Sequence, residues 1–238
     1  MRIPLRVGVF LGAGLLTAAV VEAAPSEQEN VDRLTAATQV FQDIMSKPDK
    51  GIPQDLLEKA QCVVIVPGVK KAAFIVGGEY GKGYFTCRGP HGRGWTAPGA
   101  VRVEGGSFGF QIGGENTDVV MLVMNEDGER KLLSSQFKLG GDASVAAGPV
   151  GRSASASTDL YLSAEILSWS RSRGVFAGIA LSGATVRQDL GDNEVLYGRK
   201  LSNKDIIEGN APVPAPAKQL VNTIDRYSPR SNGPKTGV

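Results

Sequence analysis

The chain is poor in the residues that build most catalytic and metal sites. It has one histidine, His91, and two cysteines in 238 residues. Zinc sites take three or four ligands drawn mainly from these two residue types, so no metal site is expected. The glycines of the segment VGGEYGKGYF have neither the dinucleotide-binding nor the Walker spacing, and no carboxylate pair stands out as an acid–base couple. We therefore expect no cofactor and no enzymatic activity.

Charge of one sign is also not in excess. Lysine and arginine total 26 residues against 24 aspartates and glutamates, and the formal net charge is +2. A net charge this small does not indicate a nucleic-acid partner, and any electrostatic recognition must be local.

The N-terminal apolar stretch, residues 7–21, is shorter than the roughly 20 residues that a membrane-spanning helix needs. Arg2 and Arg6 precede it and small residues follow it, a layout typical of a secretory signal peptide. Val21 and Ala23 stand at the −3 and −1 positions of a cleavage site after Ala23. We expect an exported protein that is periplasmic or peripherally membrane-associated, and an uncleaved anchor is the alternative.

The two cysteines, Cys62 and Cys87, lie in strand-like segments. An even pair in an exported protein favours a disulfide. Two buried free thiols are the alternative, and the sequence leaves both open.

The order of elements predicts an α+β protein. Ser26 and Glu29 form a capping box before an amphipathic helix that ends at Pro48, and short apolar segments punctuated by turns then predict strands from Cys62 onward. Consecutive strands without intervening helices pair mainly antiparallel. We expect a single domain with a mainly antiparallel, barrel-like sheet, an N-terminal amphipathic helix that packs on it and short flanking helices.

The chain divides into four predicted segments. They are a signal peptide (1–23), an N-terminal helix (24–51), the main domain (52–209) and a proline-rich linker with a short helix and a disordered tail (210–238). The strand predictions include the segments SVAAGPVGRSASAST, GVFAGIALSG and EVLYG, and the segments around Glu126 and Asp192 are predicted to be turns.

A literal G-x-S-x-G motif surrounds Ser107. The nucleophile elbow of hydrolases needs a strand that turns sharply into a helix, and a histidine later in the chain. The surrounding SFGFQIGG alternates like a strand, and His91 precedes the serine. We interpret the motif as a coincidence within a strand, and a serine hydrolase is a minor alternative.

Four blocks, in order, resemble a known family. They are AQCVVIVPGVKKAAFIVGGEYGKGYF, GWTAPGAVRVEGGSFGFQIGGENTDVVML, SRSRGVFAGIALSG and YGRKL. Together they are similar to the SYLF domain and span most of the chain after the signal peptide. The resemblance implies a lipid-binding module without catalytic activity, with phosphoinositide and actin binding known among eukaryotic and fungal members. The export signal makes this chain similar to the bacterial exported members.

The candidate lipid-binding residues are Lys70, Lys71, Arg171 and Arg173. Arg171 and Arg173 are two apart at a predicted hairpin tip, so they project to one side, and an arginine fork can hold a phosphate. Exposed turn charges of this kind contribute little to folding. The alternative is that Arg171 and Arg173 are solvated residues of a turn with no role in lipid binding.

These observations predict a non-catalytic module of the bacterial envelope that binds anionic phospholipid head groups through a local basic patch. The alternative is a structural protein of the envelope that binds another protein through its glycine-rich strands and tail.

Overall fold

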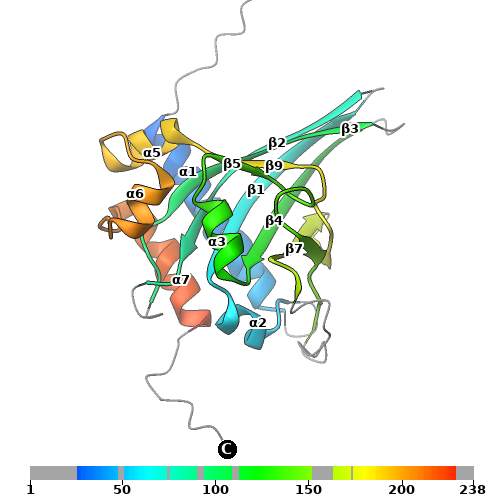
Figure 1. The fold of residues 1–238 in the computed structure, drawn as a ribbon, viewed down its shortest axis with the longest axis horizontal. Helices are drawn as coiled ribbons and strands as arrows, with labels where there is room; N and C mark the ends of the chain where they lie inside the picture. The colour runs from blue at the N-terminus through cyan, green and yellow to red at the C-terminus, as the bar shows by residue number, and fades with distance from the viewer. Residues whose placement is uncertain are drawn as a thin grey trace, which may run out of the picture.

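The structure, a computed structural model, describes residues 26–47, 51–73, 76–89, 94–108, 113–151, 163–172 and 174–228, with only the backbone described within 71–77 and 106–115. The predicted signal peptide and the predicted disordered tail lie outside these ranges. The described elements form one α+β domain around a curled, mostly antiparallel sheet (Figure 1), which confirms the predicted fold class.

The first helix, α1 (Glu27–Met45), begins at the predicted capping box. The Ser26 hydroxyl accepts a hydrogen bond from the Glu29 N–H at 3.1 Å, and the Glu29 carboxylate accepts one from the Ser26 N–H at 3.3 Å. One face of α1 is buried, and it consists of Asn30, Leu34, Ala37, Thr38, Val40, Phe41 and Ile44. The stripe packs on the sheet, as the sequence predicts, and α2 (Gln54–Lys59) follows.

The sheet has nine strands in the order β5-β9-β3-β2-β1-β4-β7-β6, with β8 paired to β7. The strands are β1 (Cys62–Ala73), β2 (Val76–Cys87), β3 (Gly99–Phe108), β4 (Gly113–Val123), β5 (Gln136–Lys138), β6 (Val145–Ala147), β7 (Ile166–Ser172), β8 (Val175–Gly178) and β9 (Thr185–Gln188). Every pairing is antiparallel except that of β6 with β7.

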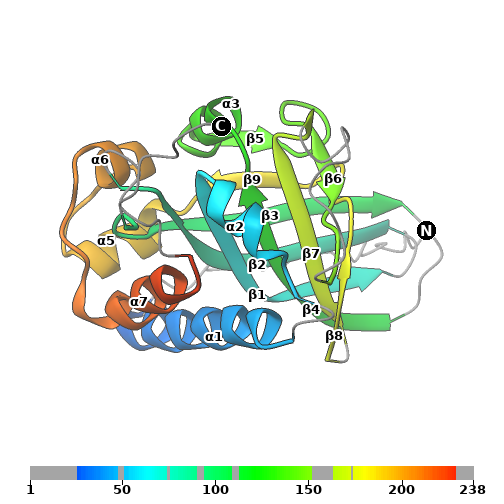
Figure 2. The same cartoon turned by 90° about the horizontal axis from the view of Figure 1, so that it is seen from below.

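Each face of the sheet carries its own apolar core. On one face, residues such as Ile65, Leu122 and Trp169 pack against α1, α2 and the C-terminal helix α7 (Lys218–Tyr227). On the other, residues such as Val64 and Phe85 pack under α3 (Glu126–Leu132) and α6 (Asn203–Glu208). Figure 2 shows α1 and α7 on one side of the sheet and α3 on the opposite side. The strands between them are buried from both sides.

The C-terminal helix belongs to this domain. Leu220 and Ile224 of α7 are buried in the same core as α1, and the short 3-10 helix η2 (Ala215–Ala217) leads into α7. Arg88 of the isolated bridge after β2 donates to the carbonyl of Ser228 at 2.9 Å and to that of Leu57 at 3.1 Å, and this ties the end of α7 to α2. None of the helices in the described ranges has the length and apolar character needed to span a bilayer.

The predicted strand EVLYG is wrong, because this segment lies in the helix α5 (Leu190–Tyr197). The Asp189 carboxylate caps the helix by accepting the Asp192 N–H at 3.1 Å. Asn193 accepts the Ala100 N–H at 2.8 Å and donates to Asn203 at 2.8 Å. These bonds hold the segment helical, and the predicted turn at Asp192 is the first turn of α5.

Other boundaries also differ from the predictions. The predicted turn at Glu126 is the start of α3, where the Asn125 side chain accepts the Gly128 N–H at 2.9 Å. In the predicted small-residue strand, the described part forms only β6, and β8 ends at Gly178. The strands β5 and β9 were not predicted, because each has only three or four residues.

Candidate functional site

Lys70 is an exposed residue of β1, in register with Tyr80 of β2 and Asn116 of β4. Lys71, the next residue, is in backbone register with Glu79 and Glu115, and its side chain lies outside the described part. The sequence Pro67-Gly68, which by itself predicts a turn before these lysines, forms a bulge within β1, because the register shifts between Ile65 and Lys70.

Arg171 does not lie at the hairpin tip, and this part of the prediction is wrong. It lies within β7 opposite Phe176, and the chain turns after it, at Gly174, where φ is +80°. The Arg171 guanidinium forms ion pairs with Asp43 of α1 and, at 2.7 Å, with Asp118 of β4. Arg173 lies outside the described residues. Arg171 therefore joins α1 to the sheet and is not a free cation.

The electrostatics of this contact match its geometry. Burial alone would lower the pKa of Arg171, but its hydrogen bonds to Asp43 and Asp118 outweigh burial and raise the pKa. Burial alone would raise the pKa of Asp43, and the hydrogen bond from Arg171 lowers it below its ordinary value. Each partner thus stabilises the charged form of the other.

We predict that Arg171→Gln lowers the free energy of unfolding by about 2 kcal/mol, between the values for exposed and buried ion pairs. Asp118, with a side chain that is 19 % exposed, then keeps no cationic partner among the described residues. The sequence predicts that this charge contributes little to folding because it is exposed, but the side chain is 20% exposed and paired with two carboxylates, so we expect a larger contribution. Arg130→Gln, in an exposed pair with Asp127 on α3, is the control and should cost under about 0.5 kcal/mol. Equal midpoints of urea unfolding for Arg171→Gln and wild type would contradict this.

A hollow of about 480 Å³ lies beside Arg171, between α1 and the bulge of β1. Arg33 and Arg171 line it, together with Asp32 and Asp118. Arg33 pairs with Asp192 at 2.5 Å. Since both arginines already have carboxylate partners, the hollow has no spare positive charge for an anion.

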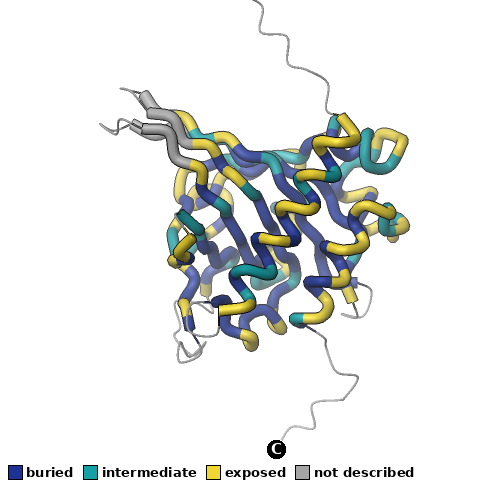
Figure 3. Tube along the Cα trace, turned by 180° about the vertical axis from the view of Figure 1, so that it is seen from behind, coloured by how far each residue is buried: buried dark blue, intermediate teal, exposed yellow. Residues whose placement is uncertain are grey.

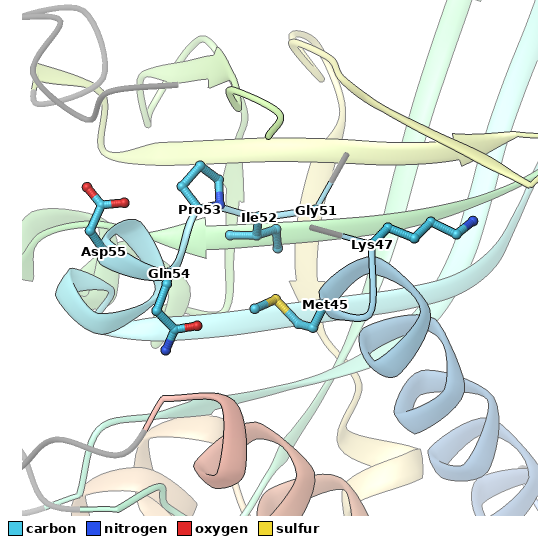
Figure 4. A pocket seen from close by; sticks show the side chains of 7 residues that line it. All are labelled: Met45, Lys47, Gly51, Ile52, Pro53, Gln54 and Asp55. Atoms are coloured by element: carbon cyan, nitrogen blue, oxygen red, sulfur yellow. The ribbon is translucent and has the colours of Figure 1, made fainter. Parts of the chain in front are cut away.

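A second hollow, of about 400 Å³, lies where α1 ends and α2 begins. Figure 4 shows Met45 and Ile52 at its centre, with Lys47 pointing away from Gln54 and Asp55. Lys47 donates to the Gly174 carbonyl at 3.1 Å. Asp55 is the single carboxylate in the lining of this hollow, and the only other charged group there, Lys47, points away from it. The hollow therefore offers no catalytic constellation among the described residues.

Two neighbouring rows across the sheet are polar. One row runs Lys138, Thr185, Glu104, Tyr80 and Lys70, and the next runs Gln136, Arg187, Arg102 and Lys82. Residues in register on adjacent strands share a face. Tyr84 lies on the face of Tyr80 and Lys82 and donates to the Asn30 carbonyl of α1 at 3.3 Å, so the two rows lie on the side where α1 packs.

Four cations of these rows form what we call the basic face: Lys70, Arg102, Lys138 and Arg187. Lys70 and Lys138 are exposed, and the side chains of Arg102 and Arg187 are 30 % and 40 % exposed. Figure 3 views the molecule from the side of α1 and shows exposed positions on the strands next to that helix. Among the described residues of the two rows, Glu104 is the only carboxylate. The basic face therefore has an excess of positive charge.

Lys82, the fifth cation of these rows, is neutralised from α5. Its ammonium group lies 2.9 Å from Asp189 and 3.4 Å from Asp192. Burial alone would lower the pKa of Lys82, and the hydrogen bond to Asp189 raises it. Burial and the neighbouring Asp189 raise the pKa of Asp192. This buried network joins β2, α5 and Arg33 of α1 and leaves Lys82 with a structural role.

The described residues show no catalytic geometry at the G-x-S-x-G motif. Ser107 lies in β3 in register with Gly77 of β2, in a strand and not at a strand-to-helix turn. His91 lies outside the described part of the chain.

The cysteines form a disulfide. Cys62 and Cys87 lie opposite each other on β1 and β2 and are bonded. They and Glu129 are the one group of clustered metal-ligand types among the described residues. Because both thiols are in the disulfide, the group cannot hold a metal through thiolates.

Reasoning from sequence missed Arg102, Lys138 and Arg187. The alternation of Val101, Arg102, Val103 and Glu104 was a usable signal for Arg102, because it predicts a strand with one charged face. Lys138 and Arg187 lie on short strands whose pairing only the tertiary structure reveals.

Comparison with known proteins gives a consistent family. The model of a family described as "Ysc84: Las17-binding protein actin regulator" matches residues 104–227. The human SH3 domain-containing YSC84-like protein 1 is 35% identical over 192 residues, which cover 79% of this chain and 55% of that protein. Protein YSC84 of Saccharomyces cerevisiae is 33% identical over 180 residues, which cover 74% of this chain and 38% of that protein.

A further yeast relative, LAS seventeen-binding protein 3, is 31% identical over 192 residues, which cover 78% of this chain and 41% of that protein. The chain thus spans about half the length, or less, of the relatives it matches. The family description names a Las17-binding protein and actin regulator, and one of these relatives is named as a LAS seventeen-binding protein.

Proposed function

Since this chain belongs to the Ysc84, or SYLF domain, family, we propose that it is an exported, non-catalytic protein that binds anionic phospholipid surfaces. The observation that carries the proposal is the basic face, where Lys70, Arg102, Lys138 and Arg187 lie in two neighbouring rows whose only carboxylate among the described residues is Glu104. Basic residues near an anionic membrane contribute about 1 kcal/mol each. The four together support peripheral, salt-sensitive attachment.

The basic face replaces the hairpin tip as the proposed contact. Of the four residues predicted from sequence, Lys70 belongs to the basic face, whereas Arg171 of the hairpin is engaged by Asp43 and Asp118. Lys70 and Lys138 lie four strands apart in one row, which at the usual strand spacing is about 19 Å. A contact of this width spans several lipid head groups and needs no enclosed pocket.

We predict that Lys70→Glu combined with Lys138→Glu weakens binding to liposomes rich in phosphatidylglycerol by nearly a thousandfold, on the order of 4 kcal/mol. The double variant removes two attractions and adds two repulsions of about 1 kcal/mol each. Both side chains are exposed, so the variant should fold like wild type. Sedimentation of the mature chain with liposomes measures the effect, and neutral liposomes should bind neither protein.

The matched control is Arg130→Glu combined with Lys204→Glu, which changes the net charge equally. These residues are exposed on α3 and α6, on the opposite side of the sheet. The control should bind nearly as well as wild type, and wild-type binding should weaken as salt shortens the Debye length from about 10 Å at 0.1 M to about 3 Å at 1 M. Equal sedimentation of both double variants would refute a role for the basic face.

A protein partner in the envelope is the second candidate. It is favoured by the names of the relatives, which describe Las17-binding and actin-regulating proteins. If the mature chain fails to bind anionic liposomes at low salt, the lipid proposal is rejected and this candidate is retained.

A further inference from the structure

Two arginines lie directly opposite each other within the basic face. Arg102 of β3 and Arg187 of β9 are in register. Like charges at directly opposed positions of a sheet repel and destabilise the pairing. One carboxylate bridges them, because the Glu104 oxygens lie 2.8 Å from Nε of Arg102 and 3.5 Å from Nε of Arg187. Two guanidinium groups therefore share a single negative charge.

The neighbouring charges do not remove this imbalance. Lys82 lies opposite Arg102 on the other side and pairs with Asp189 and Asp192. Asp189 is close enough to Arg102 to interact with it electrostatically. Its two oxygens are engaged, however, by Lys82 at 2.9 Å and by the Asp192 N–H at 3.1 Å. In the described part of the chain, Glu104 is the only ion-pair partner within 4.0 Å of either arginine.

The arginines face an open space. A hollow of about 300 Å³ is lined by Arg102, Arg187 and Ser135, by Gln188 and Asp189, and by Leu190 and Gly191 in the first turn of α5. Such a volume lies at the lower end of the range for small-ligand pockets. The N-terminal end of α5 adds a positive potential. The hollow thus combines two guanidinium groups, a hydroxyl residue and room for a small anion, and the one carboxylate in its lining, Asp189, is engaged by Lys82 and the Asp192 N–H.

We propose that this hollow, the arginine site, binds one phosphate group through the guanidinium groups of Arg102 and Arg187. Guanidinium groups bind phosphate oxygens through parallel, charge-assisted hydrogen bonds. The phosphate group belongs either to a lipid head group or to a free phosphate ion. The inference rests on the proposed function only in the first case, where the arginine site gives the basic face a specific contact.

The geometry makes opposite predictions for two neighbouring substitutions. Arg187→Gln removes one of the two cationic donors and should weaken binding of inorganic phosphate about tenfold. Glu104→Gln removes the carboxylate that competes with phosphate and should strengthen it about tenfold. Arg187→Lys keeps the charge but loses the fork and should give an intermediate loss. Arg130→Gln is the control and should leave phosphate affinity unchanged, because Arg130 lies on α3 across the sheet.

Titration calorimetry of the mature chain with inorganic phosphate, at constant ionic strength in chloride, measures these affinities. Circular dichroism establishes that each variant is folded, and if Arg187→Gln is not folded, Glu104→Gln and Arg187→Lys decide the test. The expected order of affinity is Glu104→Gln, then wild type, then Arg187→Lys and Arg187→Gln. No saturable phosphate binding by wild type, or equal affinity across the folded variants, overturns the proposal.

Vesicles distinguish the two sources of phosphate. If the site holds a lipid head group, Arg187→Gln should weaken sedimentation with phosphatidic acid vesicles more than Arg130→Gln does. If the two variants sediment equally and Arg187→Gln has lost phosphate affinity, the ligand is free phosphate. Titration with inorganic phosphate tests the arginine site alone. Liposome sedimentation of the Lys70 and Lys138 double variant tests lipid binding by the basic face. Each proposal can therefore fail independently of the other.

Discussion

Replacing Lys82 with methionine is expected to lower the free energy of unfolding at pH 7 by about 3 kcal/mol, the range for breaking a buried ion pair from one side. The side chains of Asp189 and Asp192 are only 5% and 1% exposed. Without Lys82, Asp192 keeps Arg33 as an ion-pair partner, whereas Asp189 keeps the hydrogen bond from the Asp192 N–H and the weaker electrostatic attraction of Arg102. Urea unfolding followed by circular dichroism measures the loss.

The pH dependence of stability tests whether the unpaired charge of Asp189 causes the loss in Lys82→Met. Burial alone would raise the pKa of Asp189, but in wild type the hydrogen bonds from Lys82 and the Asp192 N–H lower it below its ordinary value of 3.8. In Lys82→Met, burial and the charge of Asp192 should raise it above that value. A group with a raised folded-state pKa binds its proton more tightly when folded, so acidification stabilises the variant. In wild type the pKa of Asp189 is lowered, so the ionised carboxylate stabilises the fold at neutral pH. That stabilisation is lost as the pH falls below 3.8.

The difference in stability between Lys82→Met and wild type should therefore narrow from pH 7 towards pH 4. Adding Asp189→Asn to the variant removes the unpaired charge and should recover part of the loss at pH 7. Lys70→Met, on the same face but exposed, is the control and should cost under about 0.5 kcal/mol. A loss that stays the same at every pH would show that packing, and not charge, is responsible.

Removal of the disulfide by Cys62→Ala with Cys87→Ala is expected to cost about 3 kcal/mol, because the bond closes a loop with a sequence separation of 25 residues and constrains the unfolded chain. The two strands remain paired along β1 and β2 without it, so we expect a folded but less stable protein. Wild type treated with reductant in denaturant, then refolded, should match the double variant.

A thiol titration tests the same bond directly. Protein purified from its native compartment should show no free thiol in denaturant before reduction and two after it. Two titratable thiols before reduction would establish that the pair stays reduced in the cell and would leave the double variant with only a small effect.

The local parts of the fold could be predicted from sequence, because their causes lie within a few residues. The Ser26–Glu29 box and the apolar stripe behind it specify α1, and Ser202 begins α6 in the same way, with Asp205 completing a second box. The strands β1 to β4 and β7 have enough apolar residues to stand out. The helix α5 was missed because Asn193 within it bonds to Ala100, 93 residues away, and to Asn203 beyond the end of the helix.

The candidate site depended more strongly on tertiary structure. A sequence shows that Arg171 is basic, but its partners Asp43 and Asp118 are 128 and 53 residues away. Because folding brings both carboxylates to Arg171, this candidate phosphate ligand forms structural ion pairs instead. Conversely, Arg102 and Arg187 are far apart in sequence, and the pairing of β3 with β9 places them side by side.

The sequence by itself determined the α+β class, the main helices and long strands, and the family, because periodicity, capping boxes and linear motifs are local properties. Only the tertiary structure decided which cations have carboxylate partners and which do not. The physical reason is that the availability of a charge depends on burial and on partners within about 4 Å. In a nine-stranded sheet with the order β5-β9-β3-β2-β1-β4-β7-β6, those partners come from strands and helices throughout the chain.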